Sequence, residues 1–165
     1  MKLVTISTLF DVKYGVNLEL NRLASDPNGI NFVSRSAKNN GITGKVKALP
    51  HLTPIESGVL TVAGGGSVLE TFVQMEPFYS GRDLYYLKPL VELTLEQKLY
   101  YCMCIRANKF RFSYGRQANR TLKTIQIPAV TEIPDWVHEV FQGVAKEWSI
   151  YLVDLIKPVS PSTNN

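Results

Sequence analysis

The sequence has little cysteine, no long apolar segment and two long stretches without a carboxylate. Its two cysteines, Cys102 and Cys104, have no second Cys or Cys/His pair that would complete a four-ligand zinc site. Residues 1–8 lack the continuous apolar stretch of a signal peptide, and no later segment approaches the length of a membrane span. We therefore expect a cytoplasmic protein whose cysteines are reduced packing residues.

Catalytic and cofactor-binding motifs are also missing. The chain has neither the glycine loop of a methyltransferase cofactor site nor the Asn/Asp-Pro-Pro-aromatic loop that acts on a base amino group. The triple glycine at residues 64–66 lacks the Lys-Ser/Thr of a phosphate-binding loop and the spacing of a dinucleotide fingerprint, so it predicts a turn. His51 and His138 have no Ser or Cys nucleophile motif beside them. We expect no cofactor, no metal and no catalytic residue on this chain.

One nuclease-like arrangement is present. Asp83 is followed by Glu96 and Lys98, a set of residue types that can hold Mg²⁺ for phosphodiester cleavage. Glu96 also falls in the first turn of a predicted helix, where the helix dipole favours an acid without any catalytic purpose. A Mg²⁺-dependent nuclease therefore remains an alternative.

Acidic residues are absent from residues 27–55 and 97–131. These two acid-free windows hold 11 of the 18 lysines and arginines, and the remaining bases are spread among all 14 acids. The formal charge of +4 thus divides into two basic segments and a net-acidic remainder. Such segregation favours a polyanionic partner. Solvated surface, or a protein module that meets an acidic partner such as a DNA mimic, are the alternatives.

The first ninety residues are predicted to be mainly β. Asp-Pro-Asn-Gly at 26–29 is a turn signal, and β-favouring residues follow at 30–34, 58–63, 68–73 and 78–87, the last broken at Ser80-Gly81. Residues 36–44 are polar and glycine-containing, which predicts an exposed loop. The triple glycine predicts a turn between the second and third of these strands.

Two helices are predicted in the second half. Thr94-Leu95-Glu96-Gln97 has the form of a capping box before a largely buried helix over residues 95–109. Pro134 and the apolar residues that follow it predict an amphipathic helix to about residue 149. The fold class is therefore α/β (α+β-like): a single domain over residues 1–157 with a twisted mixed or antiparallel sheet, one buried helix and a C-terminal amphipathic helix. Residues 158–165 are predicted to be a disordered tail.

The segment 106–123 interleaves six basic residues with Phe110, Phe112 and Tyr114. Lysine and arginine gain affinity for nucleic acid by releasing counterions, while Arg reads guanine and Asn or Gln reads adenine in the major groove. The plainer interpretation is a basic helix end followed by a core strand that buries Phe110 and Phe112. The aromatics can then pack while the arginines face outward.

Within this segment, Ser-Tyr-Gly-Arg-Gln-Ala-Asn-Arg-Thr-Leu-Lys-Thr-Ile-Gln-Ile-Pro at 113–128 resembles the closing signature of target-recognition domains in type I restriction-modification specificity subunits, including related fused type II systems. Leu-Phe-Asp-Val-Lys-Tyr-Gly at 9–15 resembles the family's entry segment. Gly-Val-Leu-Thr-Val-Ala-Gly at 58–64 resembles its central strand and glycine turn, and Phe-Tyr-Ser-Gly-Arg-Asp-Leu at 78–84 lies between these motifs in the expected order. The exit after Ile127-Pro128 departs from the family pattern, and one domain is present where members usually carry two.

The resemblance implies sequence-specific recognition of double-stranded DNA, with catalysis on a partner methyltransferase (modification) subunit and on a restriction subunit. A second recognition domain or a homodimer would join two half-sites. The residues expected to face DNA are Lys38, Asn39, Asn40, Lys45, Arg82, Arg116, Gln117, Asn119, Arg120 and Lys123. The residues expected to dock a partner are Trp136, Val140, Phe141, Val144 and Trp148.

Overall fold

The computed structural model describes residues 1–112 and 118–155. The chain divides into two compact units, the first over residues 1–133 and the second beginning at Pro134. The strands are β1 (Leu3–Thr5), β2 (Phe10–Tyr14), β3 (Ser25–Val33), β4 (Ile42–Val46), β5 (Leu60–Ala63), β6 (Thr71–Val73), β7 (Phe78–Ser80), β8 (Leu84–Pro89) and β9 (Gln126–Pro128). The helices are α1 (Ile6–Leu9), α2 (Leu95–Arg106) and α3 (Trp136–Leu155), with short 3-10 turns η1 (Leu20–Arg22), η2 (Asn39–Gly41), η3 (Ala107–Phe112), η4 (Leu122–Thr124) and η5 (Val130–Glu132).

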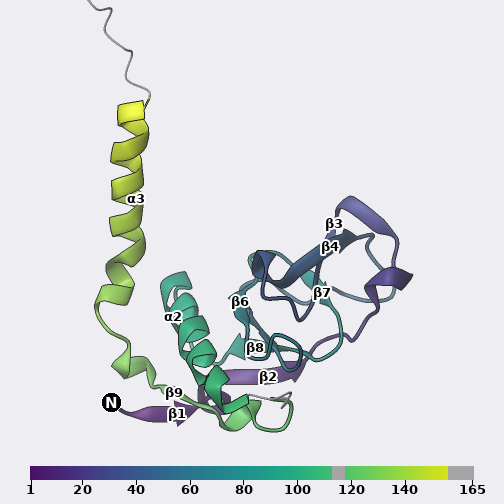
Figure 1. Ribbon diagram of the computed structural model, residues 1–165, viewed down its shortest axis with the longest axis horizontal. Coiled ribbons are helices and arrows are strands. Elements are labelled where there is room, and N and C mark those ends of the chain that lie inside the picture. The colour runs from purple at the N-terminus through teal and green to yellow at the C-terminus, as the bar shows by residue number, and fades with distance from the viewer. Residues whose placement is uncertain (113–117, 156–165) are drawn as a thin grey trace, which may run out of the picture. The chain divides into compact units, whose positions relative to one another are not determined.

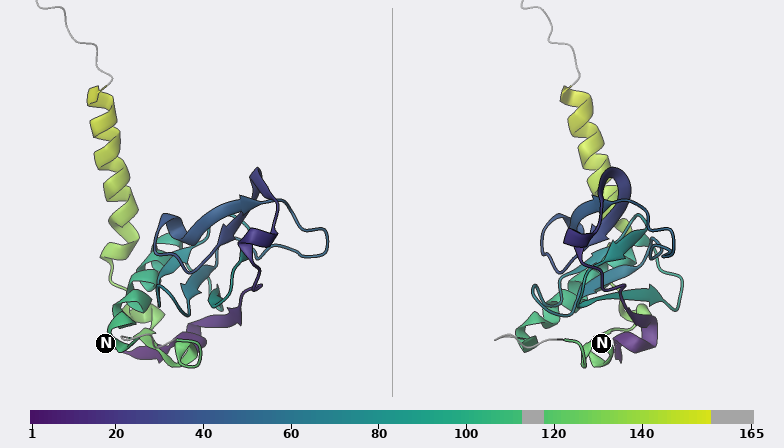
Figure 2. Two further views of the ribbon diagram at one scale, coloured as in Figure 1. Left: turned by 45° about the vertical axis from the view of Figure 1, so that its right-hand side comes forward. Right: turned by 90° about the vertical axis from the view of Figure 1, so that its right-hand side faces the viewer.

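The strands of the first unit form three sheets. The order is β2-β8-β5-β6 in an antiparallel sheet, β4-β3-β7 in a mixed sheet with β3 and β7 parallel, and β1-β9 in an antiparallel pair. Figures 1 and 2 show the β4-β3-β7 sheet at the far end of the unit from β1 and β9. The predicted α/β class with mixed and antiparallel strands is confirmed, but the division into separate sheets was not predicted.

The β4-β3-β7 sheet lies between two small apolar cores. Phe32 pairs with Tyr79 across the parallel strands, and both belong to one core; the neighbouring Val33 and Phe78 belong to the other. This follows from the period of two along a strand, which sends successive side chains to opposite faces. The buried Tyr79 hydroxyl donates to the carbonyl of Leu52 at 2.9 Å and accepts from the amide of Leu49 at 3.0 Å. The sheet is therefore covered on both faces, and the Tyr79 hydroxyl ties the segment that follows β4 to β7.

Where the sequence predicts a turn at residues 26–29, the structure has an irregularity within β3. Ser25 and Ile30 both pair with Val46, so the four residues between them lie outside the ladder. The amide of Asn28 donates to the carboxylate of Asp26 at 2.9 Å, the local bond that Asp commonly makes in turns. The strand therefore begins earlier than the predicted residue 30.

The predicted capping box opens α2. The Thr94 hydroxyl accepts from the Gln97 amide at 3.3 Å, and the Gln97 side chain accepts from the Thr94 amide at 2.9 Å. The α-helix ends at Arg106 and continues as η3, whereas the sequence predicts helix to residue 109. The expectation of a largely buried helix is wrong for Met103, which is 59% exposed. Only the face that packs on β6 and β9 is covered.

The second unit contains α3, a continuous helix that extends beyond the predicted end at residue 149 (Figure 1). Residues 150–155, for which the sequence allows either helix or strand, continue the helix. The five residues predicted to dock a partner are all exposed on it: Trp136, Val140, Phe141, Val144 and Trp148. Among residues 1–112 and 118–155, no helix combines the length and the apolar character needed to cross a membrane. The predicted tail at 158–165 lies outside the described residues.

Candidate nucleic-acid interface

The triple-glycine turn between β5 and β6 brings the two acid-free windows together. From the first window, the carbonyl of Arg35 accepts from the amide of Ser67 at 3.4 Å. From the second window, the amide of Ala118 donates to the carbonyl of Gly64 at 3.0 Å. Segments about eighty residues apart in the chain thus lie on the same turn. Arg35 and Asn119 are the polar residues that they bring there.

Glycine is required at the first position of this turn by close approach. A Cβ on Gly64 would lie 2.3 Å from Oδ1 of Asn119 and 2.8 Å from Cε2 of Tyr85, well inside contact distance. At the third position the requirement is conformational, because Gly66 has a φ of +63°, where L side chains are disfavoured. The glycines therefore allow Asn119 to pack directly against the turn between β5 and β6.

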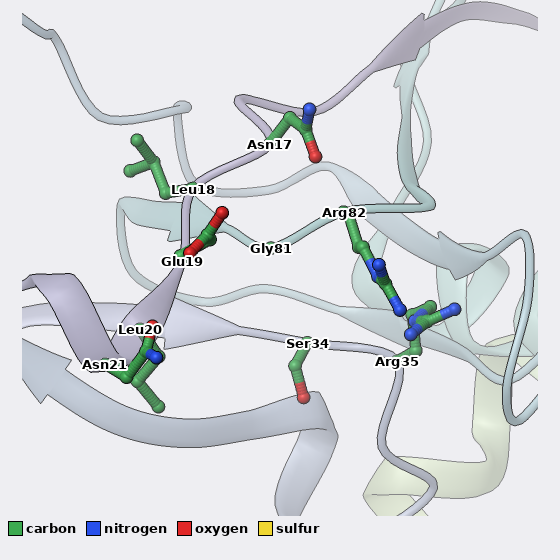
Figure 3. Close-up of a pocket in the computed structure, with 9 residues that line it drawn as sticks. All are labelled: Asn17, Leu18, Glu19, Leu20, Asn21, Ser34, Arg35, Gly81 and Arg82. Atoms are coloured by element: carbon green, nitrogen blue, oxygen red, sulfur yellow. The ribbon is translucent and has the colours of Figure 1, made fainter.

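A pair of arginines lies beside this turn at the ends of β3 and β7. The two strands are parallel and pair Val33 with Ser80, so the residues that follow them emerge at the same edge. Arg35 and Arg82 both line an open pocket of about 790 Å³, whose opposite wall is formed by residues 17–21 (Figure 3). The parallel pairing therefore places two guanidinium groups in one pocket.

The two arginines differ in their partners. Nη1 of Arg35 lies 2.8 Å from Oδ2 of Asp83, and these side chains are 27% and 22% exposed. The side chain of Arg82 is exposed and makes no ion pair within the part of the chain that the structure describes. Arg35 is therefore held in place, while Arg82 keeps its donors for another partner.

Asp83 connects this arginine pair to the tyrosines behind the turn. Its backbone has a φ of +52°, and its amide donates to the hydroxyl of Tyr14 at 2.7 Å. Tyr14 packs edge-on against Tyr85 with ring centroids 5.0 Å apart, and the Tyr85 hydroxyl donates to the carbonyl of Asn119 at 3.5 Å. Burial, with the nearby Tyr14 and Asp83, raises the pKa of Tyr85, which keeps that hydroxyl a donor. Contacts thus run without a break from Arg35 to Asn119.

The residues predicted to face DNA fall in three places. Lys38, Asn39, Asn40 and Lys45 belong to the hairpin of β3 and β4; Arg82, Asn119 and Arg120 surround the glycine turn; Lys123 lies on η4. All except Asn40 and Asn119 are exposed in this group. Arg116 and Gln117 lie outside the described residues. Of this set, the structure brings Asn119 against the glycine turn and Arg82 next to Asp83, whose carbonyl accepts from the amide of Gly64.

The side-chain amides of Asn39 and Asn40 both donate within the protein, the first inside the β3–β4 hairpin and the second to β6. Nδ2 of Asn39 donates to the carbonyl of Ile42 at 3.1 Å, and Nδ2 of Asn40 donates to the carbonyl of Val73 at 2.9 Å. Both residues have a positive φ, which asparagine tolerates better than most residues. These contacts explain their presence in the loop without a DNA base.

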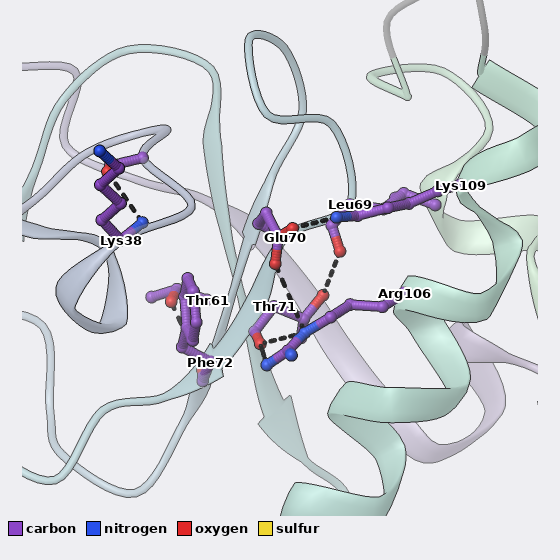
Figure 4. Close-up of polar contacts among 9 residues, drawn as sticks. Lys38, Thr61, Leu69, Glu70, Thr71, Phe72, Arg106 and Lys109 are labelled. Atoms are coloured by element: carbon purple, nitrogen blue, oxygen red, sulfur yellow. Dashed lines mark hydrogen bonds and ion pairs between the residues drawn. The ribbon is translucent and has the colours of Figure 1, made fainter.

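The beginning of the second acid-free window is also used internally. Arg106 donates to the carbonyl of Thr71 through Nε at 3.1 Å and Nη2 at 2.6 Å, and its Nε lies 3.5 Å from the Glu70 carboxylate. Lys109 pairs with the same carboxylate (Figure 4). The expectation of a core strand that buries Phe110 is wrong, since η3 leaves this ring 73% exposed. Arg106 and Lys109 thus connect α2 and η3 to the start of β6.

The residues of the nuclease alternative are separated by the length of β5. Nζ of Lys98 lies 3.5 Å from the position that a Cβ would take at Gly58, which precedes β5. The carbonyl of Asp83 accepts from the amide of Gly64, which follows β5. The intervening residues span about 20 Å at the rise of an extended strand. No group of three or more His, Cys, Asp or Glu that could hold a metal occurs among the described residues. The structure therefore gives this alternative no support.

Of the residues that line the pocket, only Arg82 was among the predicted contacts. Arg35 follows a predicted strand within an acid-free window, and that combination is a signal that could have identified it. Asn17 and Asn21 lie outside both acid-free windows and outside any motif, and only the fold places them opposite the arginines. Sequence patterns alone do not report such long-range neighbours.

Comparison with known proteins gives a consistent result. Over 135 residues, the chain is 31% identical to the type II restriction enzyme specificity subunit S.BcgI of Heyndrickxia coagulans, covering 79% of this chain and 39% of that protein. No model of a known protein family matches the chain.

Solved structures share the fold. The type I restriction-modification S subunit of M. genitalium superposes with a TM-score of 0.62 and 21% identity, over 87% of this chain and 38% of that one. The HsdS subunit of Thermoanaerobacter tengcongensis gives a TM-score of 0.63 and 17% identity, over 88% and 38%. The chain therefore spans about two fifths of the length of these proteins. The resemblance predicted from the sequence is confirmed.

Proposed function

We propose that this chain, a relative of restriction-modification specificity subunits, is a target-recognition domain that binds duplex DNA in a sequence-specific manner. The observation that carries the proposal is the meeting of both acid-free windows at the glycine turn. Arg35, Arg82 and Asn119 come from three separate segments and lie around one hairpin. A surface that combines guanidinium and carboxamide groups suits base edges, and the exposed lysines on the β3–β4 hairpin and on η4 suit phosphates.

Phosphate contacts are assigned to exposed lysines and arginines outside the pocket. Lys38, Lys45, Arg120 and Lys123 are exposed and make no ion pair with the described residues. Each phosphate that a lysine or arginine neutralises releases counterions. Such contacts therefore add affinity for any DNA sequence and make that affinity depend on the salt concentration. Affinity and base preference are therefore carried by different residues.

Catalysis is assigned to partner chains. A recognition domain of this kind would work in the cytoplasm with a methyltransferase subunit and, in a complete system, with a restriction subunit. The exposed apolar residues of α3, including Trp136, Phe141 and Trp148, are the proposed docking surface for a partner chain. A second recognition domain, or a second copy of this chain, would supply the other half-site.

Selection from a randomised duplex pool tests the proposal directly. The purified chain should enrich one short motif. Its affinity for random duplex should fall between 50 and 200 mM salt, by roughly tenfold or more if a few phosphates are contacted. Replacing Lys38, Lys45 and Arg120 by Ala should reduce the slope of log K against log salt by about 0.9 for each phosphate that is no longer neutralised. Lys88→Ala is the matched control, since Lys88 is exposed but pairs with Glu56 at 2.7 Å.

The alternatives give different results in the same material. A protein-interaction module with an acidic partner should show no salt-dependent affinity for duplex DNA. A nuclease should cleave plasmid in the presence of Mg²⁺ and lose that activity in Asp83→Ala. Binding without cleavage, together with an enriched motif, supports the recognition domain alone.

A further inference from the structure

The pocket between residues 17–21 and the ends of β3 and β7 is lined by several hydrogen-bonding groups that no other described residue engages. The carboxamides of Asn17 and Asn21 and the guanidinium of Arg82 are exposed, and none makes a side-chain hydrogen bond to another described residue. This contrasts with Asn39 and Asn40, whose amides donate to the carbonyls of Ile42 and Val73. The same residue types are therefore available in the pocket and occupied in the loop.

The wall of the pocket is fixed by contacts to β7. The amide of Val16 donates to Oγ of Ser80 at 2.7 Å, and the amide of Leu18 donates to the carbonyl of Ser80 at 2.9 Å. Asn17 is held between these two anchors with a φ of +60°. Its side chain is therefore presented from a constrained backbone, as expected where a backbone conformation serves binding.

The charges of the pocket favour base edges over phosphates. Arg35 is paired with Asp83, and Glu19 is paired with Arg22 at 2.8 Å. Within the described part of the chain, Arg82 is then the lining charge that has no ion-pair partner. A pocket that neutralises most of its own charge attracts a polyanion weakly. Its free donors and acceptors still match the hydrogen-bonding edges of purines.

We infer that this pocket is the base-reading site of the interface, with Arg82 contacting guanine, Asn17 and Asn21 contacting adenine, and the Arg35–Asp83 pair positioning Arg82. The inference rests on the proposed function and names the residues that give it sequence preference. Asp83 directly follows Arg82, and its backbone is fixed both by its ion pair and by the hydroxyl of Tyr14. Arg82 therefore leaves a turn whose backbone position is fixed, and its planar fork loses less conformational entropy per hydrogen bond than a lysine would.

Conservative variants separate base reading from charge. Arg82→Lys keeps the charge but loses the planar fork, so affinity for random duplex should stay within about twofold while discrimination at one base pair falls by about tenfold. Asn21→Ala and Asn17→Gly, which suits the positive φ, should each relax preference at another base pair. Arg22→Lys is the matched control, because Arg22 lies next to the pocket but does not line it.

Asp83→Asn tests positioning. Asparagine tolerates a positive φ and keeps an oxygen for Arg35, but it removes a carboxylate that repels DNA. Affinity for random duplex should therefore rise or remain unchanged, while discrimination at the base pair assigned to Arg82 falls. A residue with a purely structural role would instead weaken selected and random duplexes by the same factor.

The outcomes distinguish the inference from the function on which it rests. If the wild-type chain enriches a motif and Arg82→Lys, Asn17→Gly and Asn21→Ala enrich the same motif with unchanged discrimination, the pocket does not read bases. If the wild-type chain shows neither an enriched motif nor salt-dependent binding, the proposed function fails and the inference fails with it. Selective loss of base preference in the pocket variants, with Arg22→Lys unchanged, supports both.

Discussion

Asparagine illustrates how one residue type serves opposite purposes in this protein. Asn40 donates to Val73, and its carbonyl accepts from the Gln74 side chain at 2.9 Å, so it stabilises the contact between a loop and β6. Asn17 and Asn21 donate to none of the described residues through their side chains. Composition therefore indicates how many side chains of a type that can read bases are present. Their contacts within the protein determine which of them remain available to bind DNA.

Gly64→Ala should disrupt the glycine turn. The new methyl group would overlap Asn119 and Tyr85, and overpacking of this kind costs about 1–3 kcal/mol. We expect a lower denaturant midpoint in urea unfolding. The free energy of duplex binding should fall by more than the free energy of unfolding. Gly44→Ala is the control, because a Cβ there would meet Leu20 at an ordinary 3.6 Å. Equal effects of the two substitutions would contradict the role assigned to close approach.

Tyr101 and Cys102 should make the protein sensitive to alkali. Burial raises the pKa of the Tyr101 hydroxyl from 10.0 to about 12 and that of the Cys102 thiol from 9.0 to about 12. In the unfolded chain both groups release protons at their ordinary pKa, so the unfolded state binds fewer protons than the folded state in this range. The free energy of unfolding should therefore be unaffected by these groups below about pH 9 and fall from there towards pH 12.

Urea unfolding at a series of pH values measures this effect. The double variant Tyr101→Phe, Cys102→Ala should show a shallower decline than the wild-type chain above pH 9, even though loss of the Tyr101 bond to the Pro128 carbonyl lowers its stability at every pH. Parallel curves for the two proteins would show that these groups titrate alike in both states.

At the scale of elements, α2 is fixed at both of its ends. The capping box satisfies amides at its N-terminus, and Glu70 on the edge of β6 pairs with Arg106 and Lys109 at its C-terminal end. In between, Tyr101 packs edge-on against Phe10 with ring centroids 5.5 Å apart. The helix therefore links the hairpin that carries the glycine turn to the β1-β9 end of the unit.

Thr94→Ala should destabilise the first unit by about 1 kcal/mol, the usual cost of losing an N-cap. The Gln97 amide would lose its acceptor, while the Gln97 side chain could still reach the backbone of residue 94. Thermal unfolding followed by circular dichroism measures the change. Thr53→Ala serves as the control, since Thr53 is exposed and lies in a loop; an equal shift for both variants would show that the cap adds nothing.

At the scale of the whole molecule, the residues assigned to DNA and those assigned to a partner chain belong to different units. The glycine turn, the pocket and the exposed lysines around them lie within residues 1–133, and the apolar docking residues lie on α3. The two roles can therefore be removed separately.

A chain that ends at Ile133 should retain the motif and the salt dependence of the complete chain. Its sheets, α2 and the candidate interface all lie within that unit. The same truncation should abolish binding to a methyltransferase subunit, as should Phe141→Glu together with Val144→Glu in the complete chain. Fluorescence anisotropy with the selected duplex and co-purification with the subunit measure the two activities. Loss of DNA binding on truncation, in a chain that still unfolds cooperatively, would place part of the interface beyond residue 133.

Local signals predicted the elements well where the physics is local. The capping box at Thr94, the turn at Asp26 and the helix after Pro134 depend on bonds within a few residues, and each appears in the structure. Burial was less predictable, because an apolar residue on a helix is covered only where another element reaches it. Met103 and Phe110 are exposed for that reason.

By itself, the sequence determined the α/β composition, the segregation of positive charge into two windows and the resemblance to specificity subunits. These depend on residue order and can be read without knowing which segments meet. Only the tertiary structure decided that both windows converge on the triple glycine, that Asp83 engages Arg35, and that Asn17 and Asn21 face Arg82 in one pocket. The physical reason is the parallel pairing of β3 with β7, a long-range contact that brings two strand ends to one edge and that no local pattern encodes.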